Sequence, residues 1–407
     1  MNILAVCQHY WPEHFQITEV CEELVERGHK VTALVGIPNY PTGIVPEEYR
    51  NGKNREQVHN GVRIVRCNET PRKNGILGLA ENYLSYAASA TRKVKKLDGT
   101  FDVVLAYQIT PVLMAAPAAK MRRRIGTPMV LYCADIWPDA VKALLPEKFG
   151  FLMPFVKAVS TRIYRTSDAI ATNSEAYIDC FEQVHGIDRR KLSYVPQYAE
   201  DSYLAMDLSA PPSSATRFLI MGNIGKLQDT RCVLEAVSLL KHRDDFLVHI
   251  VGTGSSIGEC ETYVHERGLD SHVVFHGRRP FEEMPEFYRM ADACLLTLNV
   301  PGAPWISSTL PSRLQGYMAA GKPIIAAVNG SAGKVIEESR CGISVAAGNS
   351  AALAGAMEDF IENRGRYESC GGAGRAYFRN HFTKQRYMDD IERLLVRTAE
   401  GKTVVQG

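Results

Sequence analysis

Apolar residues near the start of the chain follow two different spacings. A short apolar run spans residues 2–6, and residues 18–27 then place apolar side chains at the spacing of a helix face that ends at Gly28. Residues 30–35 form a second run, rich in valine, threonine and leucine. The order strand, loop, helix and strand predicts a βαβ unit, which requires a parallel sheet.

The same alternation continues through the first half of the chain. Helical stretches separate the strand-like runs at the spacing that a doubly wound sheet requires. We therefore expect residues 1–205 to form one Rossmann-like α/β domain. Its further strands are expected at residues 62–66, 102–106, 128–132 and 169–171.

A segment unsuited to helix or strand follows this domain. Residues 206–216 contain two adjacent prolines and three serines, so we expect a linker there. A second alternation predicts a second Rossmann-like domain over residues 217–380. Residues 381–407 are expected to form a terminal helix that packs back toward the amino-terminal domain. The strands of the second domain are expected at residues 218–221, 246–251, 272–275, 293–298, 323–327 and 342–345.

Two such domains predict an α/β fold in which two doubly wound sheets face each other across a cleft. Ligands of open α/β sheets bind outside the carboxyl ends of the strands. The loops that follow strands are therefore the places where functional side chains are expected.

The composition excludes several classes of function. The 47 lysines and arginines nearly balance 45 aspartates and glutamates, and the net charge of +2 gives no electrostatic reason to expect a nucleic-acid partner. Ten scattered cysteines without a C-x-x-C pair are typical of reduced thiols rather than a zinc site. With no signal peptide and no apolar run of about 18 residues, we expect a cytoplasmic protein.

A glycine-bearing loop follows the first strand of the second domain. The sequence GNIGKLQ, residues 222–228, connects that strand to a helix expected to begin near Thr230. Glycines let backbone amides approach an anion, and a helix N-terminus adds partial positive charge. Lys226 and Gln228 could donate hydrogen bonds to a diphosphate. The alternative is an ordinary tight turn between strand and helix.

Two further segments bear on the ligand. VGTGSSIGE, residues 251–259, matches a dinucleotide fingerprint only loosely, and the first βα loop contains no glycine, which disfavours a nicotinamide-dependent oxidoreductase. In STLPSRLQGYMAAGKPIIAA, residues 308–327, a loop turns at Pro311 into a helix that Gly321 and Pro323 end. That helix carries Ser312, Arg313 and Gln315 near its start.

The chain contains six motifs in a fixed order: QHYWPE, GIPNYPTG, ADIWPD, GNIGKLQ, TLPSRLQGYMAAGKP and VIEESRCG. With these motifs it resembles the family-4 retaining glycosyltransferases of the GT-B fold over nearly its whole length. Within the family it resembles the bacterial branch that builds surface polysaccharides such as O-antigen, capsule and lipopolysaccharide, including N-acetyl-L-fucosamine transferases. The resemblance implies transfer from a UDP-sugar to a carbohydrate acceptor, such as a polyprenyl-diphosphate-linked sugar, with retained configuration and without a metal or other cofactor.

The resemblance also implies where the donor binds. In the family the donor lies mainly in the second domain, between the glycine loop and the helix that follows Pro311. No D-x-D occurs in the sequence, so loop amides, helix ends and cations would have to meet the charge of the diphosphate. The residues expected to contact the donor are Gly222, Asn223, Gly225, Lys226, Gln228, Gly254, Arg278, Ser312, Arg313 and Gln315.

Loops of the first domain are expected to hold the acceptor. Asp135 and Glu13 are the candidate catalytic residues, and each would position the acceptor rather than attack the donor. A same-face retaining mechanism needs no protein nucleophile, because orientation carries most of the work. For either carboxylate alone, a loop-capping role is the alternative. The expected acceptor contacts are His9, Tyr10, Asn39, Tyr40 and Trp137, and Asp139 closes the same motif as Asp135.

The sequence departs from the family at five positions. The basic pair usual in the glycine loop is replaced by Asn223 and Gln228. Most members carry two glutamates eight positions apart where this chain has Ser308 and Gly316, and a frequent histidine is replaced by Ala134. Lys226 and Gln315 could compensate from neighbouring positions. The departures keep a non-catalytic binding or scaffold protein as the alternative, and a nucleotide-sugar epimerase is a further alternative on the same fold.

One amphipathic segment favours contact with a membrane surface. Residues 71–96 combine an apolar helical stripe with basic residues at both ends, which would suit peripheral docking on the inner leaflet. The alternative is a helix packed on the core with solvated charged ends. The cations in question are Arg72, Lys73, Arg92, Lys93, Lys95 and Lys96, and a second cluster contains Lys120, Arg122, Arg123 and Arg124.

Overall fold

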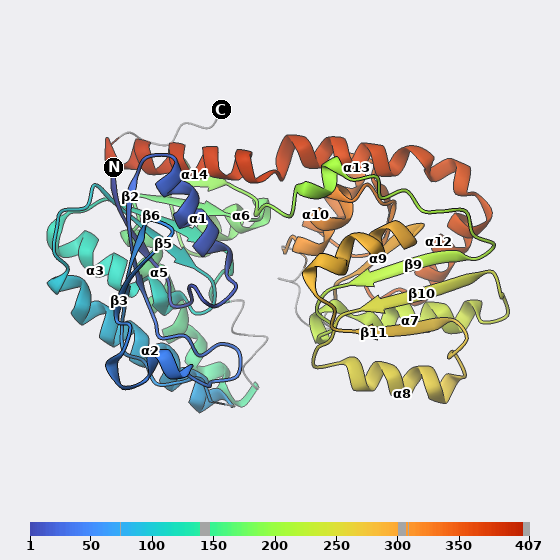
Figure 1. Ribbon diagram of the computed structural model, residues 1–407, viewed down its shortest axis with the longest axis horizontal. Helices are drawn as coiled ribbons and strands as arrows, with labels where there is room; N and C mark the ends of the chain where they lie inside the picture. Colours follow the sequence, from blue (N-terminus) through green and yellow to red (C-terminus); the bar gives the residue numbers. More distant parts are fainter. Residues whose placement is uncertain (74, 139–146, 300–306, 308, 402–407) are drawn as a thin grey trace. The chain divides into compact units, whose positions relative to one another are not determined.

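The computed structural model describes residues 1–73, 75–138, 147–299, 307 and 309–401. The chain forms two compact units (Figure 1). Unit 1 comprises Met1–Val195 and Met388–Gly407, and unit 2 comprises Pro196–Tyr387.

The segment expected to be a linker, residues 206–216, lies inside unit 2. Tyr203 and Leu208 are buried in the core of that unit, and Arg375 donates hydrogen bonds to the carbonyl oxygens of Tyr203 and Met206 at 3.0 and 2.8 Å. The division between the units therefore falls at Val195, earlier than the composition of the chain indicates.

Unit 1 contains an eight-stranded sheet in the order β3-β4-β2-β1-β5-β6-β7-β8. All neighbouring strands are parallel except β3, which pairs with β4 in the antiparallel direction. The five predicted strands after the first helix are confirmed to within two residues, but the short edge strands β3 and β8 were not predicted. The strands are β1 (Asn2–Val6), β2 (Lys30–Val35), β3 (Glu56–His59), β4 (Val62–Arg66), β5 (Val103–Gln108), β6 (Met129–Cys133), β7 (Ala169–Thr172) and β8 (Leu192–Tyr194).

Helices cover both faces of this sheet, as a doubly wound fold requires. Helix α14 belongs to unit 1 from Met388 onward, and it packs beside α1 (Figure 1). Arg27, at the end of α1, donates to Asp389 Oδ1 at 2.7 Å and to Glu392 Oε2 at 2.9 Å. The helices are α1 (Gln16–Glu26), α2 (Ile76–Lys93), α3 (Ala116–Ile125), α5 (Met153–Thr166), α6 (Glu175–Gln183) and α14 (Lys384–Ala399).

Unit 2 contains a six-stranded parallel sheet in the order β11-β10-β9-β12-β13-β14. The six predicted strands are confirmed, and those at residues 246–251 and 342–345 have the predicted bounds. Two apolar clusters, one on each face of the sheet, form the core. The strands are β9 (Thr216–Met221), β10 (Phe246–Val251), β11 (Val273–Gly277), β12 (Ala293–Thr297), β13 (Ile324–Ala327) and β14 (Gly342–Val345).

The helices of unit 2 alternate with its strands. Helix α7 begins at Thr230 and α10 begins at Ser312, as the sequence predicts. The strand order reverses direction between β9 and β12, so the loops that follow these strands diverge at a switch point where α/β sheets bind ligands. The helices are α7 (Thr230–Leu240), α8 (Ile257–Arg267), α9 (Met284–Met290), α10 (Ser312–Ala319), α11 (Ser331–Ser339), α12 (Ser350–Glu362) and α13 (Glu368–His381).

A helix that crosses a bilayer must be both long and apolar, and this applies to each helix in the described ranges. Not one of them satisfies both requirements.

Candidate functional site

The glycine loop after β9 is bonded to the loop after β10. Gly222 N donates to Val251 O at 2.9 Å, and Ile224 N donates to Thr253 O at 3.0 Å. Ser256 N donates back to Ile224 O at 3.0 Å. These hydrogen bonds join the two loops at the carboxyl edge of the unit 2 sheet. We call the joined loops, residues 222–229 and 252–256, the ledge.

Two glycines of the second loop are required by this close approach. Gly252 has φ +140, and a Cβ there would stand 1.9 Å from Gly222 O. A Cβ at Gly254 would stand 2.4 Å from Ile224 O. Packing between the two loops thus explains why residues 252 and 254 are glycines, without a bound dinucleotide. Gly254 was expected to contact the donor, and this loop contact is a structural reason for glycine at that position.

Helix α10 supports the glycine loop from its first turn. Arg313 Nη2 donates to Asn223 O at 2.5 Å. One turn later, Tyr317 OH accepts a hydrogen bond from Met221 N at 3.0 Å, at the end of β9. The guanidinium lies beside Gly222, because a Cβ at that glycine would stand 3.5 Å from Arg313 Nη2. The sequence motifs GNIG and LPSR are therefore brought together in space.

The remaining donor candidates fall into two groups. Gln228 acts inside the loop, where its Oε1 accepts from Gly225 N at 3.1 Å and from Asn223 Nδ2 at 3.2 Å. Lys226 is exposed and has no carboxylate partner among the described residues. The other exposed candidates are Asn223, Ser312 and Arg278, the last of which directly follows β11.

Gln315 is buried and bonded within unit 2. The residue is 1% exposed, and its Nε2 donates to Gln197 O at 2.6 Å. Gln315, the fourth residue of α10, is therefore bonded to the first residues of unit 2 in this structure, and its contact with the donor stays a prediction. Ser308 lies outside the described residues.

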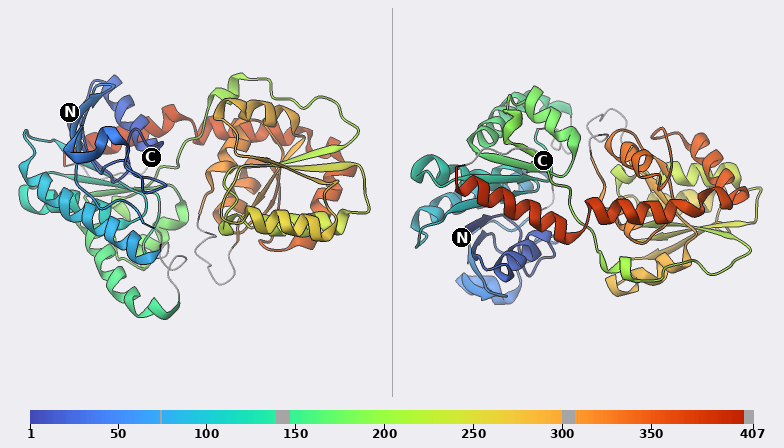
Figure 2. Two further views of the ribbon diagram at one scale, coloured as in Figure 1. Left: turned by 60° about the horizontal axis from the view of Figure 1, so that its bottom comes forward. Right: turned by 90° about the horizontal axis from the view of Figure 1, so that it is seen from above.

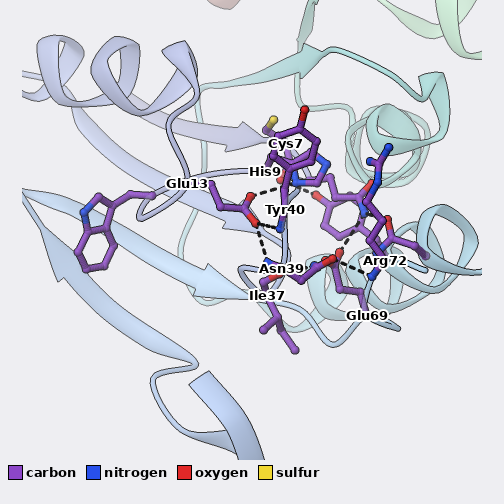
Figure 3. Close-up of polar contacts among 12 residues, drawn as sticks. Cys7, His9, Glu13, Ile37, Asn39, Tyr40, Glu69 and Arg72 are labelled. Carbon is purple, nitrogen blue, oxygen red and sulfur yellow. Dashed lines mark hydrogen bonds and ion pairs between the residues drawn. The ribbon is translucent and has the colours of Figure 1, made fainter. Parts of the chain in front are cut away.

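Glu13 joins two loops of unit 1 (Figure 3). Its Oε1 accepts the backbone N–H groups of Asn39 and Tyr40, each at 2.6 Å, and its Oε2 lies 3.0 Å from His9 Nδ1. The Glu13 side chain is only 7% exposed. This carboxylate therefore fixes the loop after β2 against the loop after β1.

A second carboxyl group, which sequence reasoning missed, lies beneath this network (Figure 3). Glu69 accepts hydrogen bonds from Asn39 Nδ2 and, at 3.1 Å, from Gln8 Nε2. Gln8 Nε2 also lies 2.9 Å from Asn82 Oδ1. Burial raises the pKa of Glu69 to about 8, although the hydrogen bonds from Asn39 and Gln8 lower it. Its position three residues after a buried strand was the available sequence signal.

The free energy of unfolding is expected to fall as the pH rises from about 4.5 to about 8. In the unfolded chain the Glu69 carboxyl loses its proton near its ordinary pKa of 4.5, but in the folded chain it keeps the proton until about pH 8. Urea unfolding at several pH values measures this slope. In Glu69→Gln, which cannot ionise, the slope should be shallower within this window, and an unchanged slope would contradict the assignment.

Of the five expected acceptor contacts, three are buried. Tyr10 is 2% exposed and His9 3%, with the His9 ring stacked on Phe15 at 4.9 Å between centroids. Asn39 is 3% exposed, and its side chain is used by neighbouring loop groups. All three residues lie inside unit 1 in this structure, and their contact with the acceptor stays a prediction.

Tyr40 and Trp137 retain exposed surface. The Tyr40 side chain is 45% exposed, and the guanidinium of Arg72 lies 5.3 Å from the centre of its ring. Trp137 is partly exposed, and its backbone N–H donates to Tyr164 OH at 3.0 Å. These two aromatic rings are the acceptor candidates that a sugar could reach.

Asp135 joins the loops after β5 and β6. Its Oδ2 accepts from Thr110 Oγ1 at 2.9 Å, and its backbone oxygen accepts from Gln108 Nε2 at 2.6 Å. Burial raises the pKa of Asp135, and the Thr110 hydrogen bond opposes this shift. The residue as a whole keeps partial exposure. Asp139 lies outside the described residues.

Within the described part of the chain, no group of three or more histidine, cysteine, aspartate or glutamate side chains could hold a metal ion. Lys226 and Arg313 are cationic side chains at the glycine loop of unit 2.

Both units match models of known glycosyltransferase domains. Residues 14–197 match the Glycosyl transferase 4-like domain, and residues 209–377 match Glycosyl transferases group 1. The two matches follow the two units closely and leave only short segments uncovered. The chain is therefore a glycosyltransferase of the GT-B fold.

Two relatives with similar sequences are also named as glycosyltransferases. A probable glycosyltransferase of Pseudomonas aeruginosa, WbjE, is 25% identical over 78% of this chain and 80% of its own length. The 2-deoxystreptamine glucosyltransferase of Streptomyces kanamyceticus is 24% identical over 76% of this chain and 79% of its own length.

Solved structures show the same fold. The sucrose-phosphate synthase of Thermosynechococcus elongatus has a TM-score of 0.75 at 15% identity and covers 98% of this chain and 100% of its own. HepE of Anabaena, solved in complex with UDP and glucose, has a TM-score of 0.68 at 17% identity over 97% of this chain and 99% of its own.

Proposed function

We propose that this glycosyltransferase moves a sugar from a UDP-sugar to a lipid-linked carbohydrate acceptor, with retained configuration and without a metal ion. The proposal places it in surface polysaccharide assembly, with a donor of the N-acetyl-L-fucosamine type, at the inner face of the plasma membrane. The observation that carries the proposal is the ledge of unit 2, where the exposed Lys226 and the guanidinium of Arg313 lie at a glycine loop.

Unit 2 would bind the donor through its diphosphate. Two cations near a glycine loop and the start of α10 can balance the charge that develops as the diphosphate leaves. Arg313 is already held by Asn223 O, so little side-chain freedom remains to be lost on binding. Support for UDP comes from HepE, which was solved with UDP and glucose.

Unit 1 would bind and orient the acceptor. Both oxygens of Glu13 are occupied by loop groups, which makes it a positioning residue, whereas Asp135 keeps an oxygen for an acceptor hydroxyl. In the proposed step the bond from the anomeric carbon to the diphosphate oxygen breaks while the acceptor oxygen bonds on the same face. The acceptor proton passes to the departing diphosphate, and no covalent enzyme intermediate forms.

Nucleotide preference tests the donor assignment. Thermal unfolding would be followed with UDP, GDP, ADP, CMP and NAD, each at saturating concentration, because a ligand of the folded state raises its apparent stability. We expect a selective rise with UDP, followed by hydrolysis or transfer from UDP-sugars. If the protein binds none of these nucleotides, it would instead be a non-catalytic relative. This is the second candidate function, because Gly316 stands at the position of a family glutamate.

Replacing Lys226 or Arg313 with alanine is expected to weaken UDP binding by about 10- to 100-fold each, since a charge-assisted hydrogen bond contributes about 1.5 to 3 kcal/mol. Titration calorimetry measures the loss. Arg289→Ala is the matched control, because Arg289 is an exposed arginine of the same unit that pairs with Glu286 at 2.7 Å. Equal affinity in all three variants would remove both residues from the donor site.

A further inference from the structure

Two of the cations at the ends of α2 pair with carboxylates of unit 1. Lys73 pairs with Glu81 at 3.1 Å, and Lys93 pairs with Glu56 at 3.3 Å. In the second basic cluster, Arg122 pairs with Asp168 at 2.6 Å. Three of the ten cations that the sequence indicated are therefore paired within unit 1.

Helix α5 presents a different surface. It packs against α3 on one face of the unit 1 sheet (Figure 2) and buries Ser160, Ile163 and Tyr164. On its outer side Phe155 is 70% exposed, and Phe151, just before the helix, is 75% exposed. Two phenylalanines this exposed and one turn apart are uncommon on a protein that only faces water.

The same helix is basic and carries no carboxylate. Its sequence MPFVKAVSTRIYRT contains three cations and no aspartate or glutamate. Lys157, Arg162 and Arg165 line a groove of about 720 Å³ together with Arg123 of α3, and no acidic side chain lines it. Among the described residues, Arg123, Lys157 and Arg162 form no ion pair.

The surrounding charge is also unbalanced. The pKa of Lys120 is lowered chiefly by Arg124, with further contributions from Lys95, Arg123 and Arg162. These cations come from α3, α5 and the turn after α2, so they form one continuous basic area. We call this area, with Phe151 and Phe155, the α5 surface.

We propose that the α5 surface docks unit 1 on an anionic lipid bilayer, with Phe151 and Phe155 inserted among the acyl chains and the cations at the phosphate headgroups. Apolar rings beside unpaired cations match the boundary between headgroups and acyl chains, and long basic side chains can reach the headgroups while their stems stay in apolar surroundings. The inference deepens the proposed function and rests on it, because a lipid-linked acceptor lies at such a boundary.

Flotation with vesicles tests the docking surface. The full chain would be mixed at low salt with vesicles of phosphatidylcholine alone and of phosphatidylcholine with one third phosphatidylglycerol. Lys157→Glu/Arg162→Glu removes charge, and Phe151→Ser/Phe155→Ser removes the apolar contact. Lys241→Glu/Arg267→Glu is the matched control, since it makes the same change in net charge at exposed positions of unit 2.

We expect the wild type and the control to float with the anionic vesicles only, and each α5 variant to bind at least 10-fold less. Raising the salt should weaken the binding of wild type far more than that of the charge variant. Thermal unfolding of each variant shows whether it is folded. Absence of wild-type flotation, equal binding by folded variants, or binding of nucleic acid in place of vesicles would overturn the proposal.

Transfer to a water-soluble acceptor separates this inference from the proposed function. The α5 variants should keep that activity, because no residue of the α5 surface belongs to the donor or acceptor site. An enzyme that transfers but never floats would refute the docking surface alone. A protein that floats through the α5 surface but neither binds UDP nor transfers would refute the proposed function alone.

Discussion

Replacing Gly252 with alanine is expected to lower the free energy of unfolding of unit 2 by at least about 3 kcal/mol. The backbone at Gly252 has φ +140, which side chains rarely tolerate, and a Cβ would stand 1.9 Å from Gly222 O. The loops after β9 and β10 would have to separate, which also breaks the ledge that carries Lys226. Urea unfolding measures the loss, and calorimetry should show weaker UDP binding.

Gly258→Ala is the matched control for this prediction. Gly258 lies in the first turn of α8, six residues further along the chain, and a Cβ there would meet nothing within 4 Å. Alanine favours helix over glycine by about 1 kcal/mol, so this variant should be as stable as wild type or slightly more stable. Similar losses in both variants would mean that glycine content, rather than the contact between the loops, determines the effect.

Asp135→Asn is expected to reduce the rate of sugar transfer by at least about 100-fold while leaving the affinity for UDP unchanged. Asparagine can still accept the Thr110 hydrogen bond at its own oxygen, so the loops after β5 and β6 should keep their positions. What is lost is the charge that orients the acceptor hydroxyl. Steady-state kinetics at saturating donor, with UDP titrations beside them, separate the two quantities.

Glu13→Gln provides the comparison for Asp135. Glu13 accepts two backbone N–H groups at one oxygen and contacts His9 with the other, so its replacement should lower stability and transfer together. If Asp135→Asn also loses stability and UDP binding in parallel with transfer, Asp135 belongs with Glu13 among the residues that hold loops.

The positions of the strands could be predicted because parallel strands are buried on both faces and appear as short apolar runs. Strand β10 is a clear case, since four of its six residues are buried and apolar and its predicted bounds are those observed. Strand β3 could not be found in this way. It lies at an edge of the sheet, and its four residues EQVH are exposed or half-buried.

The loops were predicted correctly in place but less well in detail. Tyr10 and Tyr40 both follow strands, yet one is 2% exposed and the other 45%. Periodicity fixes which face a side chain takes only inside a helix or strand, and a loop side chain turns toward whichever partner its neighbours provide. Glu69 escaped notice for the same reason, since its partners Gln8 and Asn39 are distant in sequence.

The division of unit 1 into two sequence segments has a consequence during synthesis. Arg27 leaves the ribosome long before its partners Asp389 and Glu392, which lie 362 and 365 residues further along the chain. All of unit 2 is translated in between. In the nascent amino-terminal part, this side of α1 therefore stays uncovered until the final helix emerges. A chaperone that binds exposed helix surfaces would have α1 accessible throughout the translation of unit 2.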